Sequence, residues 1–399
     1  MLEGIKVIEY ATYMAAPGAG AILSDWGADV VKVEPLGGDP IRIFFRTLGT
    51  DIQDNPVFDF DNRGKQSIAL DTSTEAGQNI LRRLAETADV FLTNVRPGGL
   101  ERSGLSYEEL AKINPKLVYC SLTGYGLQGE DADRPGFDIA SFWSRTGVAS
   151  LTVPKGSDPF PLRTAFGDHT TSMAAAAGIC AALVEAQRTG KGRLVEASLF
   201  RAGLFALGSD FAIQLFFNRV ASTKSRQEQN VPLTNFFKTG DGHWICLVQR
   251  QGDVDWVPVC KAIGREDLEQ DERFTSAKGR RANAAELVTI IDEGFAKFTK
   301  DEMAARLDAQ TLAWAPVQTL AEVATDPQTE AAGAIVQVPS TKGDGSTFAS
   351  PASPVRFPGA DDGPKGPSPK LGEHSREILG AMGLDAAAID ALYADKIVR

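Results

Sequence analysis

Asp168 and His169 stand at the head of a long apolar stretch and are the first candidates for chemistry. The segment AFGDHTTSMAAAAGICAAL, from Ala165 to Leu183, passes from polar residues to small apolar ones. An Asp here is a favoured helix N-cap, which contributes about 1 kcal/mol. The helix dipole would keep its carboxylate ionised, and an ionised carboxylate can attack a thioester carbonyl to give a mixed anhydride. Gly167 would permit a close approach, and both readings of Asp168, cap and nucleophile, stay open.

Other motifs offer less chemistry. GYGLQG, from Gly124 to Gly129, matches G-x-G-x-x-G, but the polar EDADRPGFD follows it instead of a helix. We therefore expect a glycine-rich loop and not a dinucleotide cradle. The chain has three histidines and four cysteines that lie far apart, without Walker A, HExxH or GxSxG sequences. This pattern predicts no metal site and no disulfide framework, and it favours a cytoplasmic protein.

Length and charge narrow the class further. A chain of 399 residues is long for one core, so we expect two domains. The net charge of −11 argues against a nucleic-acid partner. We see neither a signal peptide in MLEGIKVIEY nor an apolar run near the ~20 residues of a membrane span.

The first 125 residues read as alternating strands and helices. Short apolar, β-branched runs predict five strands at Ile5–Ala11, Asp29–Pro35, Ser67–Thr72, Asp89–Val95 and Leu117–Gly124. T-S-T-E from Thr72 and S-Y-E-E from Ser106 predict capping boxes. This alternation predicts a doubly wound parallel sheet, in which ligands bind beyond the carboxyl ends of the strands.

A second unit is expected beyond residue 221. Helix should dominate from Asp168 to about Gly208, followed by a polar linker at 222–230. NFFKTGDGHWICLV predicts a strand–turn–strand within a small domain at 231–330. The Pro-, Gly- and Ser-rich stretch at 339–370 predicts an extended connection to a helical tail. We expect residues 1–221 and 331–399 to belong to one large domain.

Signatures along nearly the whole chain resemble the family III CoA-transferases (CaiB/BaiF), which include formyl-CoA transferases and 2-methylacyl-CoA racemases. They are LEGIKVIEYATYMAAPGAGAILSDWGADVVKVEP, NRGKQSIALD, ADVFLTNVRPGGLERSGLSYEEL, GYGLQG, RPGFD, GDH, TGKGRLVEASLF, APVQTLAEVATDP and PKLGEHSREIL. The resemblance implies an α/β fold with a Rossmann-like large domain built from both chain ends, a smaller inserted α+β domain, and an interlocked homodimer.

The resemblance also implies a mechanism. Asp168 aligns with the family's catalytic Asp, which attacks an acyl-CoA to give an aspartyl anhydride and then an aspartyl-CoA thioester. An acceptor acid then receives the CoA. The substrates would be an acyl-CoA and a carboxylic acid, with no metal or redox cofactor beyond CoA itself.

The same resemblance implies the CoA contacts. They fall at Met14, Ala15, Leu70, Asp71, Thr72, Ser73, Asn94, Val95, Arg96, Arg102, Phe137 and Asp138. Arginine suits CoA phosphates because its guanidinium binds them bidentately. Some members carry Arg where this chain has Pro35, and Arg42, Arg46 or Arg63 are the candidates to replace it.

Transfer is favoured over racemisation. The racemases carry a proton-transferring His in a G-H-D motif, but here the motif is GFD, and Phe137 cannot move a proton. GFDIASFW, FGDHTTS and PLTNFFKTGDGHW resemble members that act on 2-hydroxy, enoyl or aryl-substituted acids. Phe137, Phe142 and Trp143 could line an apolar acyl pocket or belong to the core, and the core is favoured for Trp143. Two other classes stay open: a NAD-dependent oxidoreductase and a non-catalytic CoA-binding protein.

Overall fold

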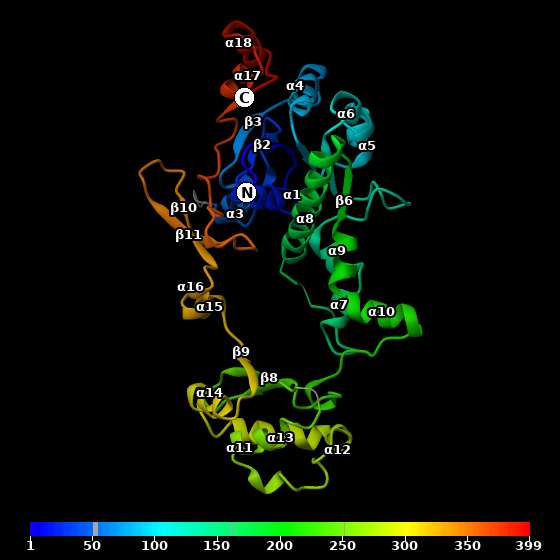
Figure 1. The fold of residues 1–399 in the computed structure, drawn as a ribbon, viewed down its shortest axis with the longest axis vertical. Helices are drawn as coiled ribbons and strands as arrows, with labels where there is room; N and C mark the ends of the chain where they lie inside the picture. Colours follow the sequence, from blue (N-terminus) through cyan, green and yellow to red (C-terminus); the bar gives the residue numbers. More distant parts are fainter. Residues whose placement is uncertain (51–54, 161, 164, 251) are drawn as a thin grey trace. The chain divides into compact units, whose positions relative to one another are not determined.

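The computed structural model describes residues 1–50, 55–160, 162–163, 165–250 and 252–399. The described chain divides into two compact units, each built from separate stretches of sequence (Figure 1). The large unit comprises Met1–Ala149, Phe160–Val220 and Gln328–Arg399, and the small unit comprises Ser150–Pro159 and Ala221–Pro327. The N-terminal and C-terminal stretches thus belong to the same unit.

A parallel sheet of six strands forms the centre of the large unit. The strands are β1 (Lys6–Tyr10), β2 (Asp29–Glu34), β3 (Gln66–Ala69), β4 (Val90–Thr93), β5 (Val118–Thr123) and β6 (Leu194–Ser198), in the order β3-β2-β1-β4-β5-β6. Every residue of β4 and β5 is buried, as expected for strands covered on both faces. The five predicted strands are confirmed. Helix dominates from Asp168 to Gly208 as expected, but the short strand β6, which was not predicted, interrupts it and pairs with β5.

Helices cover both faces of this sheet. The helices of the large unit are α1 (Ala15–Asp25), α2 (Phe44–Thr47), α3 (Pro56–Asn62), α4 (Glu75–Glu86), α5 (Pro97–Arg102), α6 (Tyr107–Ile113), α8 (Phe166–Thr189), α9 (Leu199–Ala206), α10 (Gly208–Phe217), α17 (Ser375–Ala381) and α18 (Ala386–Ala394), with a 3-10 turn η1 (Pro40–Ile43) and a π-helical turn η2 (Ile139–Ser144). The neighbours Val7 and Ile8 face opposite cores: Val7 packs with α1 and α8, and Ile8 packs with α4 and α17. The sheet is therefore doubly wound, as predicted.

The two predicted helix caps differ in outcome. The hydroxyl of Ser106 accepts a hydrogen bond from the Glu109 N–H and caps α6, which is one of the two bonds of the predicted capping box. Thr72 does not cap α4; Thr74 does, and accepts from the Gly77 N–H. The Thr72 hydroxyl is instead 2.9 Å from the Tyr10 hydroxyl, because the chain makes a further turn before the helix begins.

The C-terminal segment pairs with the end of β3, which is an edge strand of the sheet. A hairpin of β10 (Ile335–Pro339) and β11 (Thr347–Pro351) leads through the extended connection to α17 and α18, which lie beside β3 (Figure 1). The Arg399 N–H donates to the Ala69 carbonyl (3.1 Å), and the Asp71 N–H donates to the Ile397 carbonyl (2.8 Å). Leu70 and Val398 form a β-bridge between them.

The small unit has a core of its own. Its antiparallel sheet has the order β7 (Asn235–Lys238), β8 (Trp244–Val248), β9 (Ala313–Pro316), with helices α11 (Trp256–Ala262), α12 (Ala277–Ala282), α13 (Ala284–Phe295), α14 (Lys300–Ala309) and α15 (Leu320–Ala324), and 3-10 turns η3 (Arg226–Glu228) and η4 (Glu266–Leu268). Helices α7 (Val148–Leu151) and α16 (Pro327–Ala331) lie at the passages between units. The predicted hairpin is confirmed as β7–β8.

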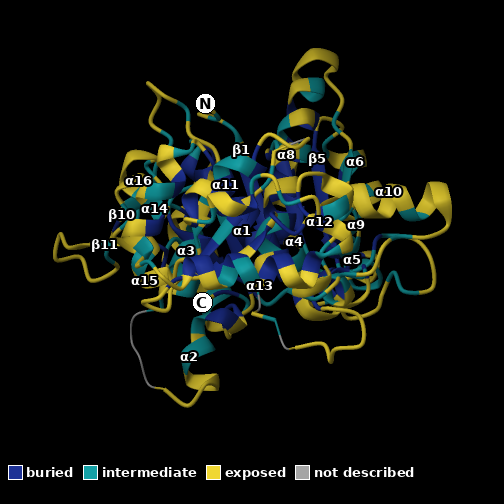
Figure 2. Cartoon of the chain, turned by 90° about the horizontal axis from the view of Figure 1, so that it is seen from below, coloured by how far each residue is buried: buried dark blue, intermediate teal, exposed yellow. Residues whose placement is uncertain are grey.

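Helix α10 has no buried residue (Figure 2). Its exposed side chains include Leu215, Phe216 and Phe217, and Phe205 of α9 is 87% exposed. Among the described residues, no single helix is long and apolar enough to cross a membrane; α9 and α10, which are bent by 80° against each other, meet that test together by length and composition alone.

Candidate active site

A cavity of about 300 Å³ opens in the large unit where β1, β4 and β5 end. The strand order reverses between β1 and β4, and ligands of such sheets bind at this reversal. The cavity is lined by Tyr13, Met14, Ala15, Ile41, Phe44, Asn94, Arg96, Pro97, Leu122, Thr123, Gly124, Ala132, Arg134, Gly136, Phe137, Asp138, Asp168 and Leu199. Its size lies at the lower end of the range for small-molecule sites.

The loop after β1 is held in an unusual conformation at the cavity wall. Tyr13 has a left-handed backbone (φ 66°), which L side chains rarely adopt outside functional or tightly held segments. The Asn94 side chain holds the preceding Thr12 by both its N–H (3.1 Å) and its carbonyl (2.6 Å). The Tyr13 N–H donates to the Asp39 carboxylate (3.1 Å), and its ring packs edge-on against Phe137.

Buried charges behind this loop fix Asp39 in turn. Lys32, fully buried, lies 3.1 Å from Glu9 and 2.9 Å from Asp39, so each charge is compensated. Burial alone would lower the pKa of Lys32, but the carboxylates of Glu9 and Asp39 outweigh it and raise this pKa. A second buried amine, Lys65, also pairs with Glu9 (2.7 Å). Paired buried charges of this kind hold their neighbours in one arrangement.

Asp168 lies in the first turn of α8 and is not its N-cap. The cap position is Ala165, whose left-handed φ of 76° turns the chain into the helix. The prediction of an N-cap at Asp168 was therefore wrong by one turn. Its carboxylate remains beside the positive end of the helix and reaches the cavity instead of closing the helix end.

Gly167 permits the close packing expected of it. Its N–H donates to the Asp138 carboxylate (3.1 Å), and a Cβ at this position would lie 2.3 Å from Asp138 Oδ1 and from Phe142 Cγ. Similarly, a Cβ on Gly124 would lie 2.6 Å from the Cα of Gly136. The glycine of GYGLQG thus seats the GFD loop against the end of β5.

The charge state of Asp168 differs from the expectation. Burial raises its pKa to about 7, and the nearby Asp138 carboxylate contributes in the same direction. Burial likewise raises the pKa of Asp138, against the backbone N–H of Gly167, which lowers it. Burial therefore opposes the helix dipole, which was expected to keep this carboxylate ionised.

The predicted site residues fall into two groups. Asp168 and the predicted CoA contacts Met14, Ala15, Asn94, Arg96, Phe137 and Asp138 line the cavity together. Leu70, Asp71, Thr72, Ser73, Val95 and Arg102 are not among the described residues that line it. Asp71 and Ser73 form a turn just beyond β3 (Ser73 N–H to Asp71, 3.0 Å), and Leu70 has no exposed surface.

For two aromatic residues the structure supports the core alternative, and two of the candidate arginines pair with carboxylates elsewhere. Phe142 and Trp143 are 1% and 9% exposed and belong to the core instead of an acyl pocket. Arg42 donates to Glu34 with two nitrogens at 2.7 Å, and Arg63 pairs with Asp25 at 2.6 Å. Arg46 lies on the exposed helix α2.

Several lining residues were not foreseen. Tyr13, Ile41 and Phe44 have no motif that marks them, but the rule that ligands bind beyond strand ends points to the segments after β1 and β2. Arg134 is the first residue of the RPGFD signature but was not predicted as a contact; it pairs with Asp131 at 3.1 Å.

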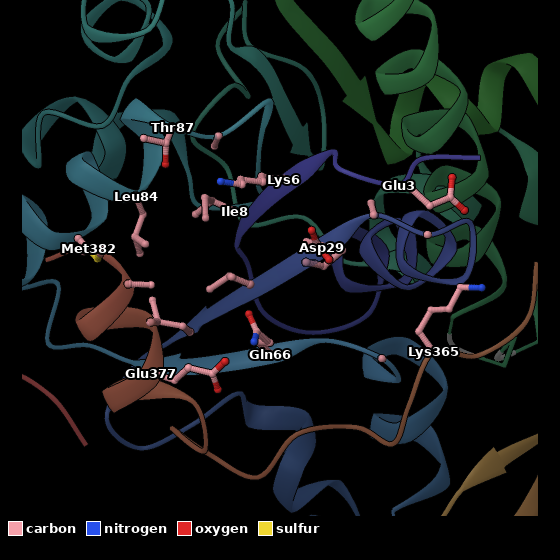
Figure 3. A pocket seen from close by; sticks show the side chains of 18 of the residues that line it. Glu3, Lys6, Ile8, Asp29, Gln66, Leu84, Thr87, Lys365, Glu377 and Met382 are labelled. Atoms are coloured by element: carbon pink, nitrogen blue, oxygen red, sulfur yellow. The ribbon is translucent and has the colours of Figure 1, made fainter.

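A larger cavity, of about 980 Å³, lies at the amino ends of β1, β2 and β3. Figure 3 shows Lys6, Asp29 and Gln66 from the strand starts facing Glu377 and Met382 from the C-terminal segment. No predicted site residue lines it among the described part of the chain. We therefore assign the site to the smaller cavity at the carboxyl ends. Within the described ranges, no group of three or more His, Cys, Asp or Glu side chains is arranged to hold a metal ion.

Comparison with known proteins identifies the class. The family model described as CoA-transferase family III matches residues 2–375. The chain is 33% identical over 401 residues to (R)-2-hydroxy-4-methylpentanoate CoA-transferase of Clostridioides difficile, covering 100% of both chains. It is 33% identical over 400 residues to cinnamoyl-CoA:phenyllactate CoA-transferase of Clostridium sporogenes, covering 99% of this chain and 97% of the relative. The crystal structure of a CaiB/BaiF family protein from Brucella suis superimposes with a TM-score of 0.83 at 32% identity, covering 96% and 99%.

The chain therefore belongs to CoA-transferase family III. It is a CoA-transferase that acts on acyl-CoA esters and carboxylic acids. The resemblance seen in the sequence is confirmed, and these findings favour a transferase over a NAD-dependent oxidoreductase or a non-catalytic CoA-binding protein.

Proposed function

We propose that Asp168 is the nucleophile of this CoA-transferase. The observation that carries the proposal is its place: Asp168 lines the cavity at the strand-order reversal together with six predicted CoA contacts. A buried carboxylate with weakened hydration is a stronger nucleophile once ionised. The N-terminal turns of α1 and α8 both border the cavity and favour the negative charge that develops on the carbonyl oxygen.

The proposed reaction has four transfers. An Asp168 oxygen attacks the thioester carbonyl, the C–S bond breaks, and CoA leaves as a thiolate. The thiolate attacks the Asp168 carbonyl of the anhydride and releases the donor acid as its carboxylate. The acceptor carboxylate attacks the aspartyl-CoA thioester, and the freed thiolate then attacks the acceptor carbonyl of the new anhydride. This last step regenerates Asp168 and gives the product acyl-CoA, with no net proton change.

The proposed acids are 2-hydroxy acids or enoyl or aryl-substituted acids. Two relatives carry such substrates in their names, 2-hydroxy-4-methylpentanoate and cinnamoyl-CoA with phenyllactate. The apolar side chains of Ile41, Phe44 and Phe137 line the cavity and suit such acyl groups. The remaining predicted contacts, from Leu70 to Ser73 with Val95 and Arg102, are proposed to support or bind the rest of CoA.

Acyl exchange in heavy water tests the proposal. The protein and its Asp168→Asn variant are incubated with a panel of acyl-CoAs and free acids, and the thioesters are read by mass spectrometry. New acyl-CoA species that the variant does not form support the proposal. Deuterium at the α-carbon without acid exchange would instead indicate a racemase of the same fold and sink the transferase mechanism.

Turnover should rise with pH through about 7. Asp168 must lose its proton to attack, and its pKa lies at about 7, so the protonated, inactive form prevails below that pH. We expect kcat/KM to fall about tenfold per pH unit on the acid side. A profile that is flat from pH 5 to 8, measured with a substrate that does not titrate there, would contradict this assignment.

We further propose an interlocked homodimer in the cytoplasm, with residues 1–221 and 331–399 as the CoA-binding domain, 222–230 as linker and 231–330 as the inserted domain, apart from Ser150–Pro159, which pack with the small unit. Helix α8 exposes an apolar stripe at helical spacing, Met173, Ala177, Ala181 and Val184. With the exposed aromatics of α10, it offers a surface for a second copy of this chain. All four cysteines are free, in keeping with a reducing compartment.

Changing this apolar surface should break the dimer. Phe216 is 82% exposed, so Phe216→Glu leaves the protomer core intact but places a charge in the proposed interface. Light scattering after gel filtration is expected to report a dimer for the wild type and a monomer for the variant. Leu320→Glu, at an 85% exposed position of the small unit, is the matched control and should stay dimeric. A monomeric wild type would refute the proposal.

A further inference from the structure

His169 is held by a buried carboxylate on the side of α8 that faces α3. Its Nε2 lies 3.1 Å from Asp61 Oδ1, and its ring packs edge-on against Phe60, with 5.1 Å between the centroids. Asp61 is 1% exposed, and its second oxygen, Oδ2, has no hydrogen-bond partner among the described residues. A buried carboxylate with so few donors needs a positive neighbour, and the imidazole is in place to supply it.

The imidazole also reaches solvent by a route of its own. The His169 side chain is 37% exposed, and it borders a cavity of about 120 Å³ with Asp61 and Ser172 that is separate from the lining of the active-site cavity. His169 can therefore gain or lose a proton while substrate fills the other cavity. The charge of the pair is thus set by the bulk pH and by its neighbours.

Charged groups face His169 from several elements. Asp61 comes from α3, with the Lys65 amine 2.6 Å from the Asp61 backbone carbonyl; Asp168 precedes it on α8; Asp138 comes from the GFD loop; and the ion pair of Asp25 and Arg63 borders the small cavity. Burial alone would lower the pKa of His169, but Asp61, Asp168 and Asp138 together raise it above its ordinary value.

The surroundings of Asp168 disfavour the ionised form that it needs for attack, and the charge of His169 opposes this effect. Burial and the charges of Asp138 and Asp61 all favour its protonated form, which cannot attack a thioester. Among the charged side chains of the described residues that shift this pKa most, His169 is the one that favours the ionised form. His169 follows Asp168 directly in the first turn of α8, and its positive charge lowers the pKa of Asp168.

We propose that His169, held as an imidazolium by Asp61, is a positioning residue that keeps the Asp168 carboxylate ionised for its attack on the acyl-CoA. The inference rests on the proposed function of Asp168. It assigns a role to a side chain that does not itself touch the substrate cavity. If His169 has this role, His169→Gln should impair the attack by Asp168 more than a substitution that keeps the positive charge, because it leaves the Asp61 charge uncompensated beside the nucleophile.

An NMR titration of the free protein tests the imidazolium without any turnover. The chain has three histidines, so the His169 ring signals can be assigned from their loss in His169→Gln. We expect His169 to keep its proton above the ordinary midpoint of about 6.5 and Asp61→Asn to lower that midpoint. A His169 that titrates at or below about 6.5 in the wild type overturns the proposal and leaves the transferase mechanism untouched.

Acyl-exchange kinetics from pH 5 to 9 test the consequence. We expect His169→Gln to lower kcat about tenfold at pH 6.5 and by less than about twofold at pH 9, where Asp168 is ionised in any case. Adding Asp61→Asn to His169→Gln should recover most of the loss at pH 6.5, and His169→Lys, which keeps the positive charge, should retain the wild-type profile. His243→Gln, a histidine in the small unit, is the control.

The two proposals fail in different ways. A His169→Gln variant whose kcat falls by one constant factor at every pH, without recovery by Asp61→Asn, overturns the role of His169 alone. A wild-type protein that exchanges no acyl group overturns the proposed function, and the NMR titration still reports the charge of His169.

Discussion

Replacing Asp168 by Asn is expected to abolish acyl exchange, with a loss of at least about 10³-fold in kcat. The amide has nearly the shape of the carboxylate, so the cavity keeps its form, but it cannot form the anhydride. Stability should not suffer. A carboxylate whose pKa is raised to about 7 destabilises the fold when it ionises above that pH, so the variant's Tm at pH 8 should equal or exceed that of the wild type.

The control for this variant is Asp301→Asn. Asp301 also lies in the first turn of a helix, α14, but it is exposed and belongs to the small unit. It should retain full activity. Residual exchange above about 1% in Asp168→Asn would mean that another group forms the covalent bond, and a lower Tm would mean that the loss reflects folding.

Replacing Gly167 by Ala should damage both stability and activity. The added Cβ would lie 2.3 Å from Asp138 Oδ1 and from Phe142 Cγ, so either the GFD loop or the start of α8 must shift. We expect a loss of about 2–3 kcal/mol in the free energy of unfolding. The shift also displaces Asp168, and a displacement near 1 Å costs about 10²-fold in kcat.

Gly380→Ala is the matched substitution for comparison. Gly380 lies in helix α17, and no described atom outside its own stretch of helix lies within 4 Å of the Cβ that Ala would add. Ala should therefore raise the free energy of unfolding by about 0.5–1 kcal/mol. Urea titrations of Gly167→Ala and Gly380→Ala measure whether the free energy of unfolding falls in the first variant and rises in the second, as expected. If Gly167→Ala were as stable and active as the wild type, the tight packing around Asp138 would not be needed for the site.

The parallel strands were predictable because burial on both faces leaves a plain signature. β4 and β5 are short, apolar and β-branched, and nothing in their sequence competes with a strand. β6 reads LVEAS and carries Glu196, which breaks the apolar run, so this strand could not be predicted separately from the helices on either side of it. Glu196 instead accepts a hydrogen bond from Leu127 N–H of the GYGLQG loop, a contact that no local pattern announces.

The residues of the site were easier to predict from the sequence than their protonation or their burial. Asp168, Phe137 and Asp138 meet in one cavity as expected, because each follows the end of a strand or begins a helix next to one. The raised pKa of Asp168 depends on burial by segments far away in the sequence, and no pattern around residue 168 carries that information. Trp143 is another residue whose surroundings the sequence does not give. A tryptophan suits either a pocket or the core, and only the packing shows that this one lies in the core.

The pairing of residues 397–399 with the end of β3 has a consequence for how the protein is made. The backbone groups of Ala69 and Asp71 find their partners in a stretch that the ribosome adds more than 300 positions later. The entire small unit, with its own core, emerges in between. A nascent chain can therefore complete the small unit first, while the edge of the large sheet beside the Asp71–Ser73 turn must wait for the final stretch to arrive.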